Sequence, residues 1–419
     1  MNFKINIYRF LIFLLLLFPV HGIASAQGGS NYSLFGIGDF QTSINANYDG
    51  LAGTSIAEPS DHEINLTNPA LWSKVTTTRL SAGYRFNQNS LTTNNQTLWQ
   101  NNGSIDGVLG LFSIDTTLGL TASFGIYPYT HVNYLIRTPV KVMLDDLEVD
   151  GDTYYQGKGG LSLAYIGGSI NILKNLSVGA SIFALFGTIQ TSMTTNIYGA
   201  DYYVSSSELS DNFSGYGYRV GLYYSLFDDV NFGAFIAGHP SLTASRSSDY
   251  ASGYPGTTDT IISYSDISIN LPTSMGLGLS YKLGNFMFGG DYSTQDFSNF
   301  SYNPGPKTEY RKSSQMSFGM SILGSKRLGA SLAEKINYNF GFGYRQLYYI
   351  INGIDINETY ASFGMNIPLV TLGTSYLDAA ITIGSRGTQN NGLIKEMFGR
   401  LTIDMSIGEV WFKPYKRDQ

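Results

Sequence analysis

The stretch "INYNFGFGY" (residues 336–344) alternates strictly between two kinds of side chain. Every even position is Ile, Tyr or Phe, and every odd position is Asn or Gly. Because successive side chains of a β-strand point to opposite faces, this pattern predicts a strand with one large apolar face and one small polar face. Residues 315–322 and 118–126 repeat the pattern. Counting such segments along the whole chain predicts 14 strands.

The connections between the predicted strands alternate between short and long. Short turns fall at 115–117, 173–175, 228–229 and 283–285, and long polar stretches fall at 87–105, 128–158, 191–213 and 239–270. Up-and-down barrels of bacterial outer membranes have short periplasmic turns, longer extracellular loops and an even number of strands. The sequence therefore predicts an all-β fold, a 14-stranded antiparallel transmembrane β-barrel.

Composition favours this membrane barrel over a soluble β-sandwich or soluble barrel. The chain has 48 Gly, 31 Tyr and 25 Phe, and only 13% of its residues are charged, against a usual ~25%. A soluble β-protein would carry charged residues on its outer face, whereas the polar faces here are mostly Ser, Gly, Thr and Asn. The net charge of −6, without a basic stripe, argues against nucleic acid as a partner.

The N-terminus has the form of an export signal. Lys4 and Arg9 precede an apolar run from Phe10 to Val20, and Ala24-Ser25-Ala26 is a small-residue cleavage site. With no cysteine in the chain, neither a lipid anchor nor a disulfide framework is expected. These features predict an integral protein of the bacterial outer membrane. Its expected parts are a signal peptide at 1–26, an N-terminal hatch or plug at 27–74, the barrel at 75–412 and a periplasmic tail at 413–419.

Residues 27–74 follow neither a strand period nor a helix period for long. Their apolar side chains still need burial, and the lumen of a 14-stranded barrel is wide enough for a plug of this size. The motif Asn68-Pro69-Ala70 lies near the end of the segment, and Pro69 favours an extended Asn68. The alternatives are a disordered periplasmic leader and a soluble appendage, and the apolar content disfavours disorder. The expected apolar anchors are Phe35, Phe40, Leu71 and Trp72.

Several of these features together resemble the FadL-type outer-membrane transporters of long-chain fatty acids and other hydrophobic compounds. The resemblance rests on Asn68-Pro69-Ala70 after a short plug, on the strand count, and on "LPTSMGLGLSYKLGNFMFGGDYS" (residues 271–293). "YSLFGIGD" (32–39) and "IGEVWFKPYK" (407–416) are more similar to a poorly characterised subgroup. The resemblance implies that ligand enters the lumen, that the hatch moves, and that ligand leaves sideways through an interruption of the third strand.

In this sequence, Gly125 and Pro128 lie where the resemblance places that wall interruption. Proline cannot donate a ladder hydrogen bond inside a sheet. The simpler interpretation, which we favour, is that Pro128 ends the strand at the membrane surface. Basic residues expected to face the lumen could either meet a ligand carboxylate or pair with Asp291 and Asp378. They are Arg79, Arg85, Arg219, Lys282 and Arg345.

The sequence carries no sign of catalysis. The histidines after residue 26 are His62, His131 and His239, and they have no metal-ligand spacing. There is also no G-x-S-x-G motif and no cysteine nucleophile. We therefore expect no enzyme, no cofactor and no metal site. The acidic stretch 145–152 is interpreted as a solvated extracellular loop rather than a calcium site, because it lacks EF-hand spacing.

Two functions from different classes compete at this point. The leading hypothesis is a channel for uptake of hydrophobic molecules such as long-chain fatty acids, with lateral release into the bilayer. The alternative is a non-transporting outer-membrane component of a protein secretion or surface-attachment system. Expected partners are outer-membrane lipid and lipopolysaccharide, a hydrophobic small-molecule ligand and the barrel assembly machinery, and the barrel is expected to be a monomer.

Overall fold

A computed structural model describes residues 29–411, apart from 42, 44, 94–96, 145–146, 199–202, 228, 254–258, 304, 306, 328 and 370–373. The expected signal peptide at 1–26 and the expected tail at 413–419 lie outside the described residues. The chain is almost entirely β-strand, with a short N-terminal segment of mixed structure.

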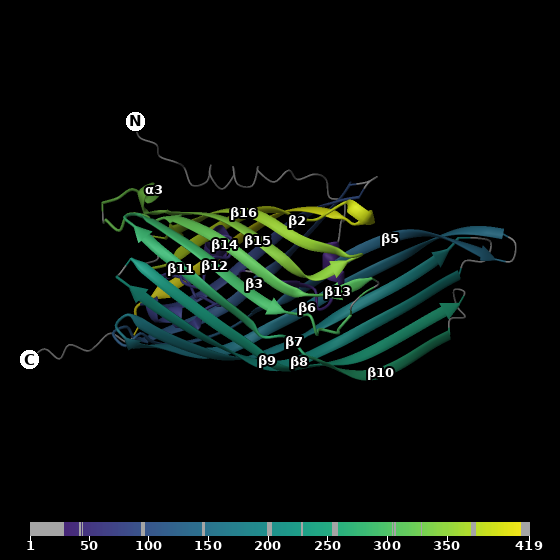
Figure 1. The fold of residues 1–419 in the computed structure, drawn as a ribbon, viewed down its shortest axis with the longest axis horizontal. Helices are drawn as coiled ribbons and strands as arrows, with labels where there is room; N and C mark the ends of the chain where they lie inside the picture. The colour runs from purple at the N-terminus through teal and green to yellow at the C-terminus, as the bar shows by residue number, and fades with distance from the viewer. Residues whose placement is uncertain are drawn as a thin grey trace, which may run out of the picture.

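Among the described residues, fourteen strands form one closed antiparallel barrel, and three of these strands are each split into two pieces. The last strand pairs with the first along its whole length, from Lys395↔Thr92 to Glu409↔Thr78, which closes the ring. This confirms the predicted strand number and direction (Figure 1). The strands are β2 (Thr78–Thr92), β3 (Thr97–Asp115), β4 with β5 (Leu120–Pro128, Thr130–Leu144), β6 (Leu147–Leu173), β7 (Leu176–Ile197), β8 (Tyr203–Leu226), β9 (Val230–Gly253), β10 with β11 (Asp259–Ile269, Ser274–Leu283), β12 (Phe286–Asp296), β13 with β14 (Thr308–Tyr310, Lys312–Ile322), β15 (Asn337–Ile351), β16 (Ile354–Pro368), β17 (Tyr376–Gly387) and β18 (Lys395–Glu409).

The alternation in the sequence separates the two faces of the barrel wall. On β11, the exposed Leu277 and Leu279 alternate with the glycines and with Ser280, which is 1% exposed. Large apolar side chains face outward in this way around the barrel, as a lipid-facing surface requires. Between residues 29 and 411, the described part of the chain has no helix that is long and apolar enough to span a bilayer.

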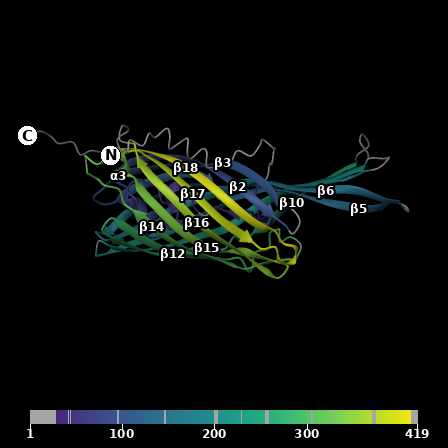
Figure 2. The ribbon, with the colours of Figure 1, turned by 90° about the horizontal axis from the view of Figure 1, so that it is seen from above.

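The long polar stretches of the sequence are not the loops that the sequence predicted. Strand β6 has 27 residues and β8 and β9 have 24 each, whereas about 9–11 residues cross a bilayer. The stretches at 128–158, 191–213 and 239–270 are therefore mostly strand, and β5, β6 and β10 lie in a sheet that projects beyond the barrel (Figure 2). Polar residues suit these extensions, because both faces of a projecting sheet can meet water.

The described part of the acidic stretch, residues 147–152, belongs to this projecting sheet rather than to a free loop. Residues 145 and 146 lie outside the described part of the chain. Glu148 lies 2.8 Å from Lys141 across the β5–β6 hairpin, and Asp152 lies 2.6 Å from Arg137. These two carboxylates are therefore held by cations of the neighbouring strand.

The N-terminal segment, residues 29–77, lies inside the ring of strands (Figure 1). Most of its described residues are buried, and they contact the inward face of the barrel. Inward polar side chains such as Ser362 and Arg85 bond to the N-terminal segment. The segment contains η1 (Asn31–Leu34), β1 (Asp39–Phe40), α2 (Ala46–Gly50) and η2 (Pro69–Lys74); two further short helices, α3 (Leu332–Lys335) and η4 (Asn390–Gly392), lie in connections.

Candidate functional site

The Asn68-Pro69-Ala70 motif begins the short helix η2 and fastens it to the barrel wall. Asn68 is the N-cap with an extended backbone, as the following proline predicts, and its side-chain oxygen accepts a hydrogen bond from the Ala70 N–H at 3.1 Å. Its side-chain Nδ2 donates to the Ile56 carbonyl at 2.7 Å and to the Leu222 carbonyl of β8 at 2.9 Å. One fully buried amide thus joins two parts of the N-terminal segment to β8.

Two wall glycines make this close approach possible. A Cβ atom at Gly221 of β8 would overlap the Asn68 side-chain oxygen and lie 2.8 Å from the Pro69 Cδ. A Cβ atom at Gly179 of β7 would overlap the Pro69 carbonyl group. The motif therefore packs directly against bare backbone, a contact that only glycine allows at these two positions.

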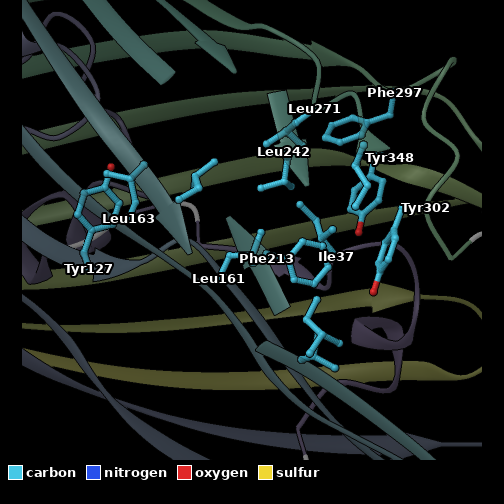
Figure 3. Close-up of a cluster of buried hydrophobic side chains, with 14 of the residues drawn as sticks. Ile37, Tyr127, Leu161, Leu163, Phe213, Leu242, Leu271, Phe297, Tyr302 and Tyr348 are labelled. Carbon is cyan, nitrogen blue, oxygen red and sulfur yellow. The ribbon is translucent and has the colours of Figure 1, made fainter. Parts of the chain in front are cut away.

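The expected apolar anchors are all packed inside the barrel, in three places. Trp72 is 1% exposed, donates its indole N–H to the Asn65 carbonyl at 2.6 Å and stacks on Tyr165. Leu71 packs with Tyr223 beside Ala70. Phe40 packs against Phe297 and Tyr348, and Phe35 packs against Tyr349, in the large hydrophobic cluster. Figure 3 shows part of this cluster, with Phe297, Tyr348 and Ile37 labelled.

Replacing Asn68-Pro69-Ala70 with three glycines should loosen the N-terminal segment without preventing barrel assembly. The change removes the Asn68 cap and its two carbonyl contacts, and losing an Asn cap alone typically costs ~1 kcal/mol. Heat-modifiable migration on gels reports the barrel, and planar-bilayer conductance reports the segment. Normal migration with altered conductance is the expected result; unaltered conductance and uptake would show that the motif does not control the lumen.

Most of the predicted lumenal cations are already paired or bonded within the protein. Arg85 contacts Asp49 of the N-terminal segment at 2.8 Å and Asp106 of β3 at 3.0 Å. Arg345 contacts Glu358 at 3.0 Å and also donates to the Phe40 carbonyl. Arg85 and Arg345 therefore do not pair with Asp291 or Asp378, the two carboxylates that the sequence suggested.

The other three predicted cations have different surroundings. Arg79 is buried and donates to the Ser406 hydroxyl at 3.2 Å. Lys282 is exposed at the end of the barrel that carries the short turns. Arg219 donates to the Leu66 carbonyl and to the Tyr127 hydroxyl. Asp291, meanwhile, accepts hydrogen bonds from the Ser55 and Ile56 N–H groups rather than from a cation.

The third strand of the barrel is broken at one residue, Tyr129. The β3–β4 ladder ends at Val108↔Ile126, and β4 ends at Pro128, close to Gly125. The chain then continues as β5 rather than ending at a loop, and among the described residues β5 pairs with β6 and β1 but not with β3. Tyr129 turns its N–H to the Leu161 carbonyl of β6. The wall therefore lacks a backbone ladder between β3 and β5.

The N-terminal segment covers the free edge of β5 at this gap. Phe40 of β1 pairs with Thr130, and Asp39 pairs with His131. The Gly29 N–H donates to the Asn133 carbonyl at 2.9 Å. Movement of the segment would therefore uncover a strand edge in the wall.

A cavity of about 190 Å³ lies beside the break, between the N-terminal segment and the wall. Tyr129, the residue at the break, lines this cavity together with Phe40, Phe297 and Tyr348. Arg219, Arg345 and His239 supply polar groups. The cavity offers aromatic walls and a few polar contacts, an arrangement typical of small-molecule sites.

Sequence reasoning missed Tyr129, His239, Phe297 and Tyr348 as cavity residues. The aromatic run at 297–302 between β12 and β13 was the one available signal, because three large aromatics in a short connection need burial. Burial, and after it the charge of Asp291, raises the pKa of Glu58 to about 8, which favours the protonated carboxyl at neutral pH.

Known proteins support this architecture. Three solved structures share the fold: the CymD monoaromatic hydrocarbon channel (14% identity, 90% of this chain and 100% of that chain, TM-score 0.60), a Pseudomonas aeruginosa FadL homologue (11%, 88% and 98%, 0.60) and the Ralstonia pickettii toluene transporter TbuX (13%, 87% and 98%, 0.54). No curated protein matches the chain.

The fold and its relatives place the protein in a cell compartment and a family. A closed 14-stranded barrel of this kind makes it an integral protein of the bacterial outer membrane, and the neighbours are channels rather than enzymes. The family model named BamG matches residues 6–418. The chain therefore belongs to the BamG family and has the fold of the FadL-type outer-membrane channels.

Proposed function

We propose that the protein takes up small hydrophobic molecules through the outer membrane, with the N-terminal segment acting as a movable hatch. The observation that carries the proposal is the position of Tyr129, which both interrupts the third strand and lines the lumenal cavity. A ligand in the cavity is thus next to the unpaired edge of β5. When the N-terminal segment moves, an apolar ligand can pass sideways into the bilayer, where burial of each CH₂ is worth ~0.8 kcal/mol.

The size of the cavity favours a ligand of about one aromatic ring over an extended fatty acid. Its 190 Å³ is close to an engineered cavity of ~150 Å³ that holds one benzene molecule. Seven Phe and Tyr side chains on its wall suit the faces and edges of a ring. Two of the proteins with a similar fold are a monoaromatic hydrocarbon channel and a toluene transporter, which agrees with this substrate class.

Filling the cavity should stop uptake. Ala237 of β9 faces the cavity and is 1% exposed, so Ala237→Trp places an indole in the ligand space. Uptake of labelled toluene and of labelled palmitate would be measured in cells that lack the gene and carry each variant. We expect toluene uptake to fall at least about tenfold, equivalent to a lost binding free energy of ~1.4 kcal/mol.

Ala234→Trp provides the matched control, because Ala234 lies on the outward side of the same strand. This variant should transport as the wild type does. Equal toluene uptake with and without the gene would contradict the proposed function, and palmitate uptake without toluene uptake would contradict the inferred ligand size.

A second candidate function is a non-transporting part of a protein-assembly or surface-attachment complex. The family name BamG hints at an association with the barrel assembly machinery, and the sheet formed by β5 to β10 projects from the barrel as an exposed surface (Figure 2). Co-purification of the tagged protein with the barrel assembly machinery, together with unchanged uptake of both compounds after gene deletion, would favour this function over transport.

A further inference from the structure

Three side chains with metal-binding atoms meet where the N-terminal segment touches strand β17. They are His62, Glu63 and Asp378, and one ligand atom from each lies within 4.8 Å of the others. Their exposed fractions are 3%, 2% and 0%. The sequence could not indicate this cluster, because Asp378 is more than three hundred positions away from the other two residues.

Four atoms of these side chains have no hydrogen-bond donor or acceptor among the described residues. They are both carboxylate oxygens of Glu63, Oδ2 of Asp378 and Nε2 of His62, and all four are buried. Leaving a buried polar atom unpaired costs ~1–3 kcal/mol, and more for a charged group. Four such atoms in one place form a buried set of electron-pair donors.

Neighbouring residues hold these ligands in an orientation that suits a metal ion. The His62 Nδ1 atom lies 3.0 Å from Asp61 Oδ1, and a carboxylate can only accept, so Nδ1 carries a proton. In the neutral ring Nε2 then has a free lone pair, and it lies 3.8 Å from Asp378 Oδ1. Asp61 is in turn bonded to Lys326 at 3.1 Å. Metal-bound histidines almost always have such a carboxylate behind them, which fixes the tautomer and the ring.

Asp378 and the His62 ring are held as well. The Asn366 side chain donates to Asp378 Oδ1 at 2.6 Å, which leaves Oδ2 as the free oxygen. The ring of Tyr376 stacks on the His62 ring, with 4.0 Å between centroids. Contacts with Asp61, Tyr376 and Asn366 thus hold the His62 ring and the Asp378 carboxylate in place.

The carboxylates gathered around the cluster also favour a bound cation. Asp404 lies directly opposite Asp378 on β18, and two like charges at opposed strand positions repel each other. Arg79 is the nearby cation, yet among the described residues it makes no ion pair within 4.0 Å with Glu63 or Asp378.

We propose that His62, Glu63 and Asp378 bind one divalent transition-metal ion, best matched by Zn²⁺, which fastens the N-terminal segment to β17. One imidazole and two carboxylates form a mixed N/O donor set that Zn²⁺ accepts, whereas Ca²⁺ and Mg²⁺ use oxygen ligands. Ligands ~2.1 Å from a tetrahedral Zn²⁺ lie roughly 3.4 Å apart, so the side chains close the site by moving about an ångström. A fourth position is left for water.

An ion can reach the site from the end of the barrel that carries the short turns. Asp61, His62 and Tyr376 line a second cavity of about 500 Å³, together with residues of the β14–β15 connection next to α3. In Figure 1, α3 lies at that end of the barrel. The site is therefore buried but adjacent to an open cavity.

Metal content of the purified full-length protein tests the proposal. The protein in detergent would be stripped with a chelator, incubated with Zn²⁺, passed through gel filtration and analysed by elemental mass spectrometry. We expect one Zn²⁺ per chain in the wild type, and a loss of at least about tenfold in affinity for Glu63→Gln and for Asp378→Asn. Excess Ca²⁺ should not displace the Zn²⁺.

Glu58→Gln is the matched control, since Glu58 is another buried carboxyl of the N-terminal segment that lies outside the three-residue cluster. It should retain one Zn²⁺ per chain. Heat-modifiable migration confirms that each variant is folded, and X-ray absorption of the Zn²⁺-loaded wild type should show one nitrogen and two carboxylate ligands. No retained Zn²⁺ in the wild type would overturn the proposal in favour of a proton shared by Glu63 and Asp378. Equal Zn²⁺ in the wild type and in Glu63→Gln would also overturn it, because the ion would then be bound elsewhere.

Discussion

Replacing Glu358 with alanine is expected to lower the free energy of unfolding by about 3–5 kcal/mol, the usual cost of breaking a buried ion pair by removing one partner. Glu358 lies between two buried arginines of neighbouring strands, 3.0 Å from Arg345 and 2.6 Å from Arg386. Removing it leaves two buried positive charges with too few counter-charges. Urea-induced unfolding in detergent, followed by tryptophan fluorescence, measures the change.

The same substitution should also loosen the N-terminal segment. Arg386 holds Asp39 at 2.6 Å and the Ser30 hydroxyl at 2.9 Å, and Arg345 holds the Phe40 carbonyl. These contacts depend on the two arginines staying in place against Glu358. Limited proteolysis of the folded barrel should therefore cut the N-terminal segment faster in Glu358→Ala than in the wild type.

Asp355→Ala provides a control on the same strand, β16. Asp355 also pairs with an arginine, Arg311, at 2.7 Å, but its side chain is 56% exposed. Water screens such a pair, so its loss should cost only about 0–1 kcal/mol. Similar losses of stability for the two variants would mean that water reaches Glu358 and that the lumen is not packed as described.

Replacing Gly221 with leucine should displace the Asn68-Pro69 part of the N-terminal segment from its position against β8. Even a Cβ atom at this position would overlap the Asn68 side-chain oxygen. The Asn68 side chain cannot turn aside without breaking its hydrogen bonds to the Ile56 and Leu222 carbonyls. The variant should lose the Asn68 contacts together with the packing of Leu71 and Trp72. The expected result is a folded barrel with a large steady conductance in planar bilayers.

Gly399→Leu is the corresponding control. Gly399 is on β18, and nothing lies within 4 Å of an added Cβ atom there. This variant should keep the wild-type conductance and the wild-type resistance of the N-terminal segment to protease. If Gly221→Leu behaves like Gly399→Leu, the N-terminal segment does not obstruct the lumen at this wall.

Part of the candidate site could be predicted from local rules. Proline after Asn68 predicted the extended backbone that the structure has at this residue, and Asn68 is in the position where an N-cap residue bonds. Apolar residues in a segment without a period predicted burial, and Phe35, Leu71 and Trp72 are buried. The partners of these residues were not predictable, because they lie on strands far away in the chain.

The sequence by itself determined the all-β class, the number of strands and the lipid-facing side of each one, because side-chain alternation is a local consequence of strand geometry. The prediction that the long polar stretches are loops was wrong, because side-chain alternation does not show how far a hairpin extends beyond the membrane. Only the tertiary structure decided the break at Tyr129, the cavity beside it and the pairing of the buried charges. Arg386 and Asp39 are 347 positions apart, and Ala52 and Ser362 are 310 apart. Such contacts exist only after the barrel has closed around the N-terminal segment, so no local pattern can encode them.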